Sequence, residues 1–293
     1  MGPMLRRALL GILALVLVAL PAVSRSASRT VILATTTSVQ DSGLLDLLVP
    51  MFERASGNTV KTISVGTGQA LALAARGEAD VTLAHAPELE RTYVQAGKLQ
   101  NRRLVMSNDF VVVGPHADPA GIRGEKSATV ALKRIADRGA RFVSRGDKSG
   151  THTLELALWK QAGVRPAAPW YIESGQGMGA TLGIADDRGA YTITDRATLL
   201  ALAKRLALKS MVEGDRPLVN LYSVMEANPA NGPRVNAAGG KTFADFMVAP
   251  ETQAVIKTFG VEKYGRPLFV PMAGTEETIA RERVWENPPR VRP

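Results

Sequence analysis

The fold is decided by one stretch near the start of the chain, Thr30-Val31-Ile32-Leu33-Ala34-Thr35-Thr36-Thr37-Ser38. Its apolar half predicts a short buried strand, and its last four residues place a row of hydroxyl groups where that strand ends. Apolar side chains recur at helical spacing over residues 44–52, with Asp41 and Ser42 as candidate N-caps. The stretch therefore predicts a strand that leads directly into a covering helix.

The same alternation continues along the chain. Further strands are expected at 60–65 and 81–84, and helices at 69–76 and 87–96, with short connections between them. Strands that alternate with helices in this way form a parallel sheet covered by helices. The fold class is therefore α/β.

The pattern starts again after a long apolar strand at 104–114, and a second long strand at 219–225 closes it. Two α/β units joined by two long strands predict two lobes with a hinge and a central cleft. Lobe I is expected to comprise residues 29–110 plus 224–293, and lobe II residues 111–223. The cleft between the lobes is the expected ligand site.

The first residues have the pattern of an export signal. Arg6 and Arg7 precede an apolar run at 8–20, and small residues follow Pro21. A basic start, a short apolar core and a small-residue exit are typical of a secretory signal peptide, which we assign to residues 1–27. An uncleaved membrane anchor is the competing interpretation, but the run is short for a permanent membrane helix. We expect the mature protein to be periplasmic.

The composition excludes several classes of protein. The 293 residues are 45% apolar and 22% charged, which is typical of a globular chain. The absence of cysteine excludes disulfides and thiolate chemistry, and the presence of only three histidines argues against a histidine-rich metal site. The formal charge of +9 falls to +6 without residues 1–27, which contain three arginines and no acid. Because the basic residues are scattered and lack aromatic partners, we expect no nucleic-acid partner.

Two loops with hydroxyl and glycine residues follow the first two predicted strands. Residues 35–38 lie at the edge where open α/β sheets bind ligands, and the N-terminus of the next helix favours an anion there. In Gly66-Thr67-Gly68-Gln69, glycine allows backbone N–H groups to approach a ligand closely. The second loop matches neither a phosphate-binding P-loop nor a dinucleotide fingerprint. Ordinary helix capping and a tight turn are the structural alternatives for the two loops.

A third loop, Ser144-Arg145-Gly146-Asp147-Lys148-Ser149-Gly150-Thr151-His152, opens a helix of the second unit. Arg145 offers a planar set of N–H donors to an oxyanion, and Asp147 is expected either to cap the loop or to hold Arg145 in place. Ser149 and Thr151 provide a cap and a first-turn hydroxyl. A solvated arginine beside a helix cap is the structural alternative. A Ser149–His152–Asp147 triad is the catalytic alternative, but these residues crowd one loop and no Gly-x-Ser-x-Gly elbow is present.

Two further features follow predicted strands. The glycine-rich turn at 174–179 either lines the cleft or simply connects a strand to a helix. His85 either reaches the rim of the cleft or satisfies a local hydrogen bond, and we favour the local bond.

Together these segments resemble the periplasmic tungstate-binding component of bacterial ABC importers. The resemblance spans residues 30–270, and its hydroxyl-rich opening and Ser-Arg-Gly-Asp-x-Ser-Gly-Thr-His segment are fairly specific. The segments that carry it are 32–38, 41–46, 65–70, 144–152, 175–181 and 191–196. Residues 84–87 and the charged C-terminal tail depart from the expected pattern, which leaves the contacts at the rim of the cleft open.

The resemblance implies a two-lobed type II periplasmic-binding-protein fold that holds an oxyanion with hydroxyls, backbone N–H groups and one arginine. By that similarity the direct contacts are Thr36, Ser38, Thr67, Arg145 and Thr151. Combined with the loops above, the candidate oxyanion-binding residues are Thr36, Thr37, Ser38, Thr67, Gly68, Arg145, Ser149, Gly150 and Thr151. No cofactor is expected, and no metal is expected other than the one inside the oxyanion.

The expected function is that of an extracytoplasmic solute-binding protein, not an enzyme. It captures tungstate in the cleft and delivers it to the membrane permease of an ABC transporter, as a monomer. Three alternatives stay open: a binding protein for molybdate, sulfate or phosphate, an exported serine hydrolase that uses Ser149, and an anion sensor that docks to a receptor. Tungstate and molybdate are nearly equal in size, so the resemblance alone separates them.

Overall fold

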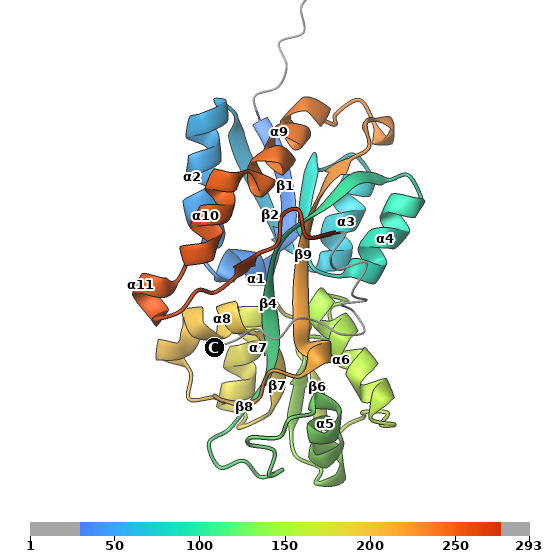
Figure 1. The fold of residues 1–293 in the computed structure, drawn as a ribbon. Helices are drawn as coiled ribbons and strands as arrows, with labels where there is room; N and C mark the ends of the chain where they lie inside the picture. The colour runs from blue at the N-terminus through green and yellow to red at the C-terminus, as the bar shows by residue number, and fades with distance from the viewer. Residues whose placement is uncertain (1–29, 277–293) are drawn as a thin grey trace, which may run out of the picture.

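A computed structural model describes residues 30–276, and the predicted signal peptide at 1–27 lies outside this range. The described chain forms two halves that are joined by β4 (Leu99–Gly114) and β9 (Val219–Ala227), as Figure 1 shows. No helix within residues 30–276 combines the length and the apolar character that crossing a membrane requires. The predicted α/β class is confirmed.

We call the half that contains both ends of the described chain lobe I. Besides parts of β4 and β9, its elements are β1 (Thr30–Thr36), α1 (Thr37–Asp41), α2 (Leu44–Ser56), β2 (Thr59–Val65), α3 (Thr67–Ala75), β3 (Val81–Ala84), α4 (Pro87–Gln95), η3 (Pro229–Asn231), α9 (Ala237–Val248), α10 (Pro250–Thr258), α11 (Val261–Tyr264) and β10 (Val270–Pro271).

The other half is lobe II, and it is contributed by the middle of the chain. Its elements are α5 (Ala128–Asp137), β5 (Phe142–Ser144), α6 (Gly150–Gln161), β6 (Tyr171–Glu173), α7 (Met178–Asp187), β7 (Thr192–Asp195), α8 (Arg196–Leu202), η1 (Ala203–Arg205), β8 (Lys209–Val212) and η2 (Arg216–Leu218). The residue boundaries 110/111 and 223/224 stay a prediction.

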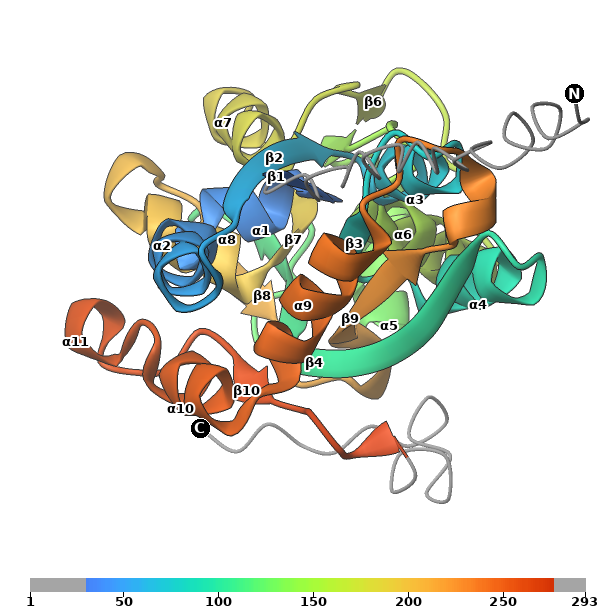
Figure 2. The same cartoon turned by 90° about the horizontal axis from the view of Figure 1, so that it is seen from above.

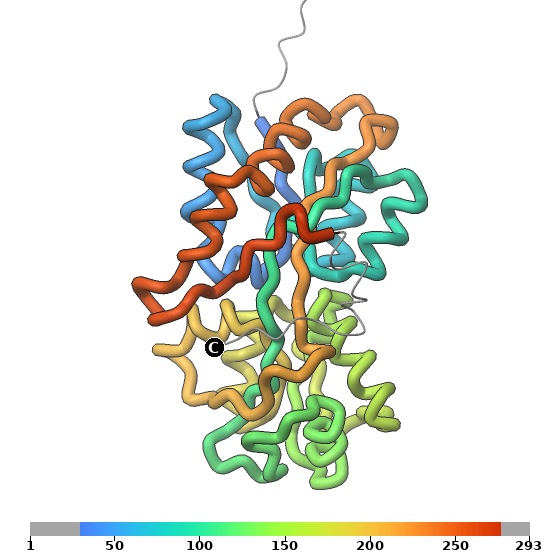
Figure 3. Tube along the Cα trace, in the orientation of Figure 1, coloured from blue at the N-terminus to red at the C-terminus, as the bar shows by residue number. Residues whose placement is uncertain are grey.

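Strand β4 belongs to both lobes. Its first part pairs antiparallel with β9 in the sheet of order β10-β4-β9-β3-β1-β2. Its last residues, from Phe110 onward, pair instead with β7 and β8 of lobe II. The chain can therefore be followed in Figure 3 from one lobe to the other along β4 and back along β9.

Strand β1 lies between β2 and β3 and runs parallel to both. The carboxyl ends of the three strands consequently meet at one edge of the sheet, and that edge faces lobe II. The strands are followed by the short helix α1, by residue 66 and by residues 85–86, so sequence-distant residues are neighbours there. This edge is where open α/β sheets bind ligands.

Each lobe has its own apolar core. In lobe I, α9 packs on β9 and β1 (Figure 2), and the rings of Phe52 and Phe243 meet edge to face with centroids 5.0 Å apart. In lobe II, Phe142 and Trp159 make a similar contact at 5.1 Å, beside the buried ring of Tyr191. The lobe I core also includes Ala197 of α8, so the two lobes make apolar contact through this helix.

The start of the first helix differs from the prediction. Asp41 and Ser42 were expected as N-caps of the helix over residues 44–52, but the N-cap of that helix, α2, is Gly43, and Ser42 Oγ accepts the N–H of Leu44 at 3.3 Å. A short helix that was not predicted, α1, precedes it, and Thr36 Oγ1 accepts the N–H of Val39 at 3.4 Å. The hydroxyl run supplies its own cap, and Gly43, at φ 79°, separates α1 from α2. The hydroxyls therefore lie within a helical turn rather than in a loop before it.

Candidate functional site

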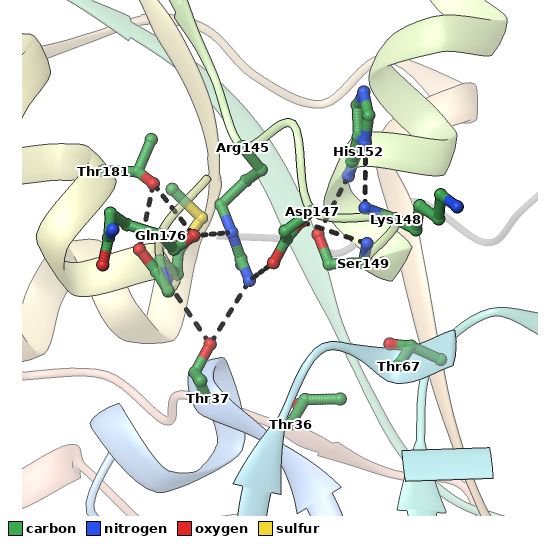
Figure 4. Close-up of polar contacts among 12 residues, drawn as sticks. Thr36, Thr37, Thr67, Arg145, Asp147, Lys148, Ser149, His152, Gln176 and Thr181 are labelled. Carbon is green, nitrogen blue, oxygen red and sulfur yellow. Dashed lines mark hydrogen bonds and ion pairs between the residues drawn. The ribbon is translucent and has the colours of Figure 1, made fainter. Parts of the chain in front are cut away.

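Arg145 follows β5 and points out of lobe II toward lobe I (Figure 4). Its side chain is only 3% exposed and forms an ion pair with Asp147. Its Nε–H donates to the carbonyl oxygen of Gln176 at 2.8 Å, and its Nη2 lies 3.5 Å from Thr37 Oγ1. Arg145 Nη1 makes no hydrogen bond within residues 30–276, so this buried guanidinium keeps N–H donors that a ligand can use.

Lobe I places a row of buried hydroxyls opposite this guanidinium. Thr36, Ser38 and Thr67 are each at most 3% exposed. Thr36 Oγ1 and Ser38 Oγ are 3.1 Å apart, and Thr67 Oγ1 accepts the N–H of Gly150 from lobe II at 3.2 Å. The ends of β1 and β2 therefore bring the predicted loops at 35–38 and 66–69 together, opposite the loop at 144–152 of lobe II.

The third loop shows why its hydroxyls differ in role. Ser149 is the N-cap of α6, and its Oγ accepts the N–H of His152 at 3.2 Å. Thr151 Oγ1, by contrast, is buried and has no hydrogen-bond partner within the described residues. Gly68 faces the backbone of Lys148, and a Cβ added at Gly68 would lie 3.5 Å from the carbonyl oxygen of Lys148, which is ordinary van der Waals contact. A buried hydroxyl without a partner is costly, so Thr151 is suited to a ligand that accepts its proton.

Other contacts hold the two lobes together. Thr37 Oγ1 is 3.4 Å from the backbone nitrogen of Met178, and Asp41 accepts the N–H of Gly179 at 3.1 Å. Both partners belong to the N-terminal turn of α7. The glycine-rich turn at 174–179 thus lines the interface, which the sequence left undecided.

The predicted catalytic alternative has no supporting geometry. His152 Nδ1 accepts the N–H of Lys148 at 3.0 Å, while Ser149 Oγ faces the backbone of the helix that it caps. Asp147 is paired with Arg145 and accepts the N–H of Ser149 at 3.1 Å. Within residues 30–276 no hydrogen bond joins the Ser149 hydroxyl to the His152 ring, so the three residues form a helix cap and an ion pair.

His85 is the residue that sequence reasoning undervalued. Its ring is 4% exposed, and its Nε2 is 3.2 Å from Ser38 Oγ. The expected local hydrogen bond therefore exists, but its partner belongs to the candidate site. Burial, reinforced by the nearby positive charge of Arg145, lowers the pKa of His85 to about 4. The signal that the sequence offered was its position directly after the strand predicted at 81–84.

A buried carboxylic acid, Asp195, lies close to the hydroxyl row. Asp195 caps α8 by accepting the N–H and the hydroxyl of Thr198, and burial raises its pKa to about 6. The Thr198 hydroxyl is also 3.4 Å from the carbonyl oxygen of Ser38. Lobe II therefore supports the backbone of the hydroxyl row as well as facing it.

The arrangement suits an anion without a cofactor. All nine candidate residues lie at the meeting edge of the two lobes or in the loop that faces it. The groups they present are hydroxyls, backbone N–H groups and one guanidinium, which are donors that an oxyanion accepts. Their role as ligand contacts stays a prediction.

Comparison with known proteins places the chain in a family. Residues 23–251 match the model of the PBP superfamily domain. A tungstate-binding protein TupA of Peptoclostridium acidaminophilum is 45% identical over 249 residues, which cover 84% of this chain and 87% of that protein.

Two solved structures are similar to the whole described fold. The tungstate ABC transporter structure from Geobacter sulfurreducens is 47% identical with a TM-score of 0.72, and the match covers 78% of this chain and 98% of that one. The tungstate-binding protein TupA from Desulfovibrio alaskensis G20 is 42% identical with a TM-score of 0.67, and this match covers 83% of this chain and 99% of that one. The predicted type II periplasmic-binding fold is thereby confirmed, and the chain belongs to the TupA family of the periplasmic-binding-protein superfamily.

Proposed function

We propose that this protein is the extracytoplasmic solute-binding component of an ABC importer and that it captures tungstate between its two lobes. It acts in the periplasm as a monomer and delivers the oxyanion to a membrane permease. The names of its relatives support tungstate as the ligand. None of these relatives is named as an enzyme, and we propose no catalytic role.

The observation that carries the proposal is the buried guanidinium of Arg145 facing the hydroxyl row across the lobe interface. A tetrahedral dianion must lose its water before it is bound tightly, which is costly unless donors replace that water. Fixed hydroxyls and backbone N–H groups do so without flexible counter-charges, and a guanidinium adds strong charge-assisted hydrogen bonds.

We assign the nine residues Thr36, Thr37, Ser38, Thr67, Gly68, Arg145, Ser149, Gly150 and Thr151 to the binding shell. Lobe I supplies the first five and lobe II the rest, so neither lobe alone completes it. The contacts Thr37–Arg145 and Thr67–Gly150 support this, because they already join the two sets. When the lobes close around the oxyanion, the protein takes the shape that a permease would recognise.

One feature favours a second candidate ligand. The Asp147 carboxylate forms an ion pair with Arg145 and can only accept hydrogen bonds. It would therefore favour an oxyanion that carries a proton to donate, such as hydrogen phosphate. A fully ionised dianion such as tungstate, molybdate or sulfate would meet repulsion from the same carboxylate. The proposed function requires that Arg145 and the neutral donors outweigh this repulsion.

Thermal unfolding with tungstate, molybdate, sulfate and phosphate in parallel tests the proposal. A ligand present at 100 times its Kd stabilises the native state by about 2.7 kcal/mol, which raises the Tm of a chain this size by about 5–10 °C. We expect this shift with tungstate and none with sulfate. A shift with phosphate alone would favour the second candidate, and no shift with any of the four anions would contradict the proposal.

A further inference from the structure

His85 lies directly behind the hydroxyl row of lobe I. It follows β3, the strand that pairs with β1, and its Nε2 is 3.2 Å from Ser38 Oγ. Ser38 Oγ is in turn 3.1 Å from Thr36 Oγ1. The three side chains belong to residues that are at most 4% exposed, so this chain of contacts is shielded from bulk water.

The ring of His85 is held in place on several sides. Its centroid is 4.8 Å from that of Tyr222 and 6.1 Å from that of Phe110. Gly150 of lobe II abuts the opposite edge, where a Cβ would lie only 2.9 Å from His85 Nδ1. The ring therefore keeps Nε2 directed at Ser38.

The ring is neutral at neutral pH and carries a single N–H. Burial and the positive charge of Arg145 lower its pKa to about 4, against smaller opposing effects of the Asn220 side chain and of the Asp147 charge. Nδ1 has no hydrogen-bond partner within the described residues. Asn220 Oδ1 is likewise buried without a hydrogen-bond partner, so the unpartnered Nδ1 does not by itself decide which ring nitrogen carries the proton.

The number of hydroxyl protons in the Thr36–Ser38 pair favours a proton on Nε2. Thr36 and Ser38 have one hydroxyl proton each, and the contact between them uses one. If Nε2 accepts from Ser38, the second proton is also used, and none is left for an oxyanion. If Nε2–H donates to Ser38 Oγ, one proton remains for the ligand.

We propose that His85 is a positioning residue whose Nε2–H donates to Ser38 Oγ and so leaves one hydroxyl proton of the Thr36–Ser38 pair to face the bound oxyanion. The inference rests on the proposed function, because the argument needs a ligand that only accepts hydrogen bonds. His85 itself acts through Ser38 and does not touch the oxyanion.

Nuclear magnetic resonance of the wild-type protein with ¹⁵N-labelled histidine reads the tautomer directly. The chain has three histidines, and single His116→Gln and His152→Gln variants assign the signals by elimination. We expect an N–H signature at Nε2 of His85 and an unprotonated Nδ1. A proton on Nδ1, directed into the cavity that Asn220 also lines, would overturn the inference, as would a doubly protonated ring.

A double-mutant cycle tests whether His85 acts through Ser38. His85→Phe is expected to weaken tungstate binding at least about threefold, because Ser38 loses the donor that orients and polarises its hydroxyl. In a Ser38→Ala background the same change should alter the Kd less than twofold. An equal loss in both backgrounds would overturn the inference. His116→Phe, at an exposed position, is the matched control.

The two experiments distinguish a failure of the His85 proposal from a failure of the proposed function. If the wild-type protein binds none of the four oxyanions, the proposed function fails, and the purpose assigned to the tautomer fails with it. If tungstate binds but His85 carries its proton on Nδ1, only the positioning role is wrong. The resonance measurement needs no variant at position 85, so a His85→Phe protein that fails to fold does not prevent the decision.

Discussion

Replacing Arg145 with alanine should reduce tungstate affinity more than any other single change at the site. The Arg145 side chain is 3% exposed, and its partner Asp147 is 16% exposed, so the pair is largely desolvated. Truncating one member of such a pair costs about 2–5 kcal/mol, much of it from the charge left unpaired. In this protein the unpaired charge would be a carboxylate facing a dianion, which adds to the loss.

A cost of about 2–5 kcal/mol corresponds to a Kd that rises about 30- to 4,000-fold. Calorimetric titration with tungstate measures it, and thermal unfolding of the ligand-free variant confirms that the fold is intact. Arg138→Ala is the matched control, because it removes the same charge from an exposed position in lobe II. Affinity of Arg145→Ala within about threefold of the wild-type value would refute the site assignment.

Three further changes separate binding from stability. Thr151→Val should leave the ligand-free protein as stable as before or about 1 kcal/mol more stable, because its buried hydroxyl has no partner, while calorimetry shows weaker tungstate binding. Gly150→Ala should weaken binding, since its Cβ would lie 2.8 Å from the carbonyl oxygen of His85, whereas Gly183→Ala, with nothing within 4 Å, should leave titrations unchanged. Burial raises the pKa of Glu155 to about 7, so its contribution to stability is complete below about pH 4.5 and is lost as pH rises to about 7. Glu155→Gln should remove up to about 3 kcal/mol of that pH dependence in denaturant unfolding, and an unchanged slope would contradict the buried, protonated state.

The strand ends were predictable because periodicity and parallel topology are local properties. An apolar strand followed by hydroxyls, then a second strand followed by Gly66-Thr67-Gly68, places both loops at one sheet edge in any βαβ unit. The separate roles of Ser149 as a cap and Arg145 as a donor also follow from residue type. The contact between Arg145 and Thr37 does not, since 108 residues separate them and no local pattern links them.

The misses have physical causes as well. Asp41 and Ser42 looked like N-caps because their side chains suit that role, but the hydroxyl run forms a separate helix, α1, which ends at Asp41, and Gly43 is the N-cap of α2. His85 looked unremarkable because sequence does not reveal that β3, rather than another strand, neighbours β1. Sheet order is set by packing of the whole lobe, which no local pattern contains.

The central claim is that an oxyanion is bound between the hydroxyl row of lobe I and the guanidinium of lobe II. Crystals grown with tungstate, with diffraction recorded at a tungsten absorption edge, locate the metal without reference to any protein feature. The account predicts one strong anomalous peak between Ser38 and Arg145, within hydrogen-bonding reach of oxygens on the tungsten. A peak elsewhere on the molecule, or none in crystals of a protein shown to bind tungstate, would contradict it.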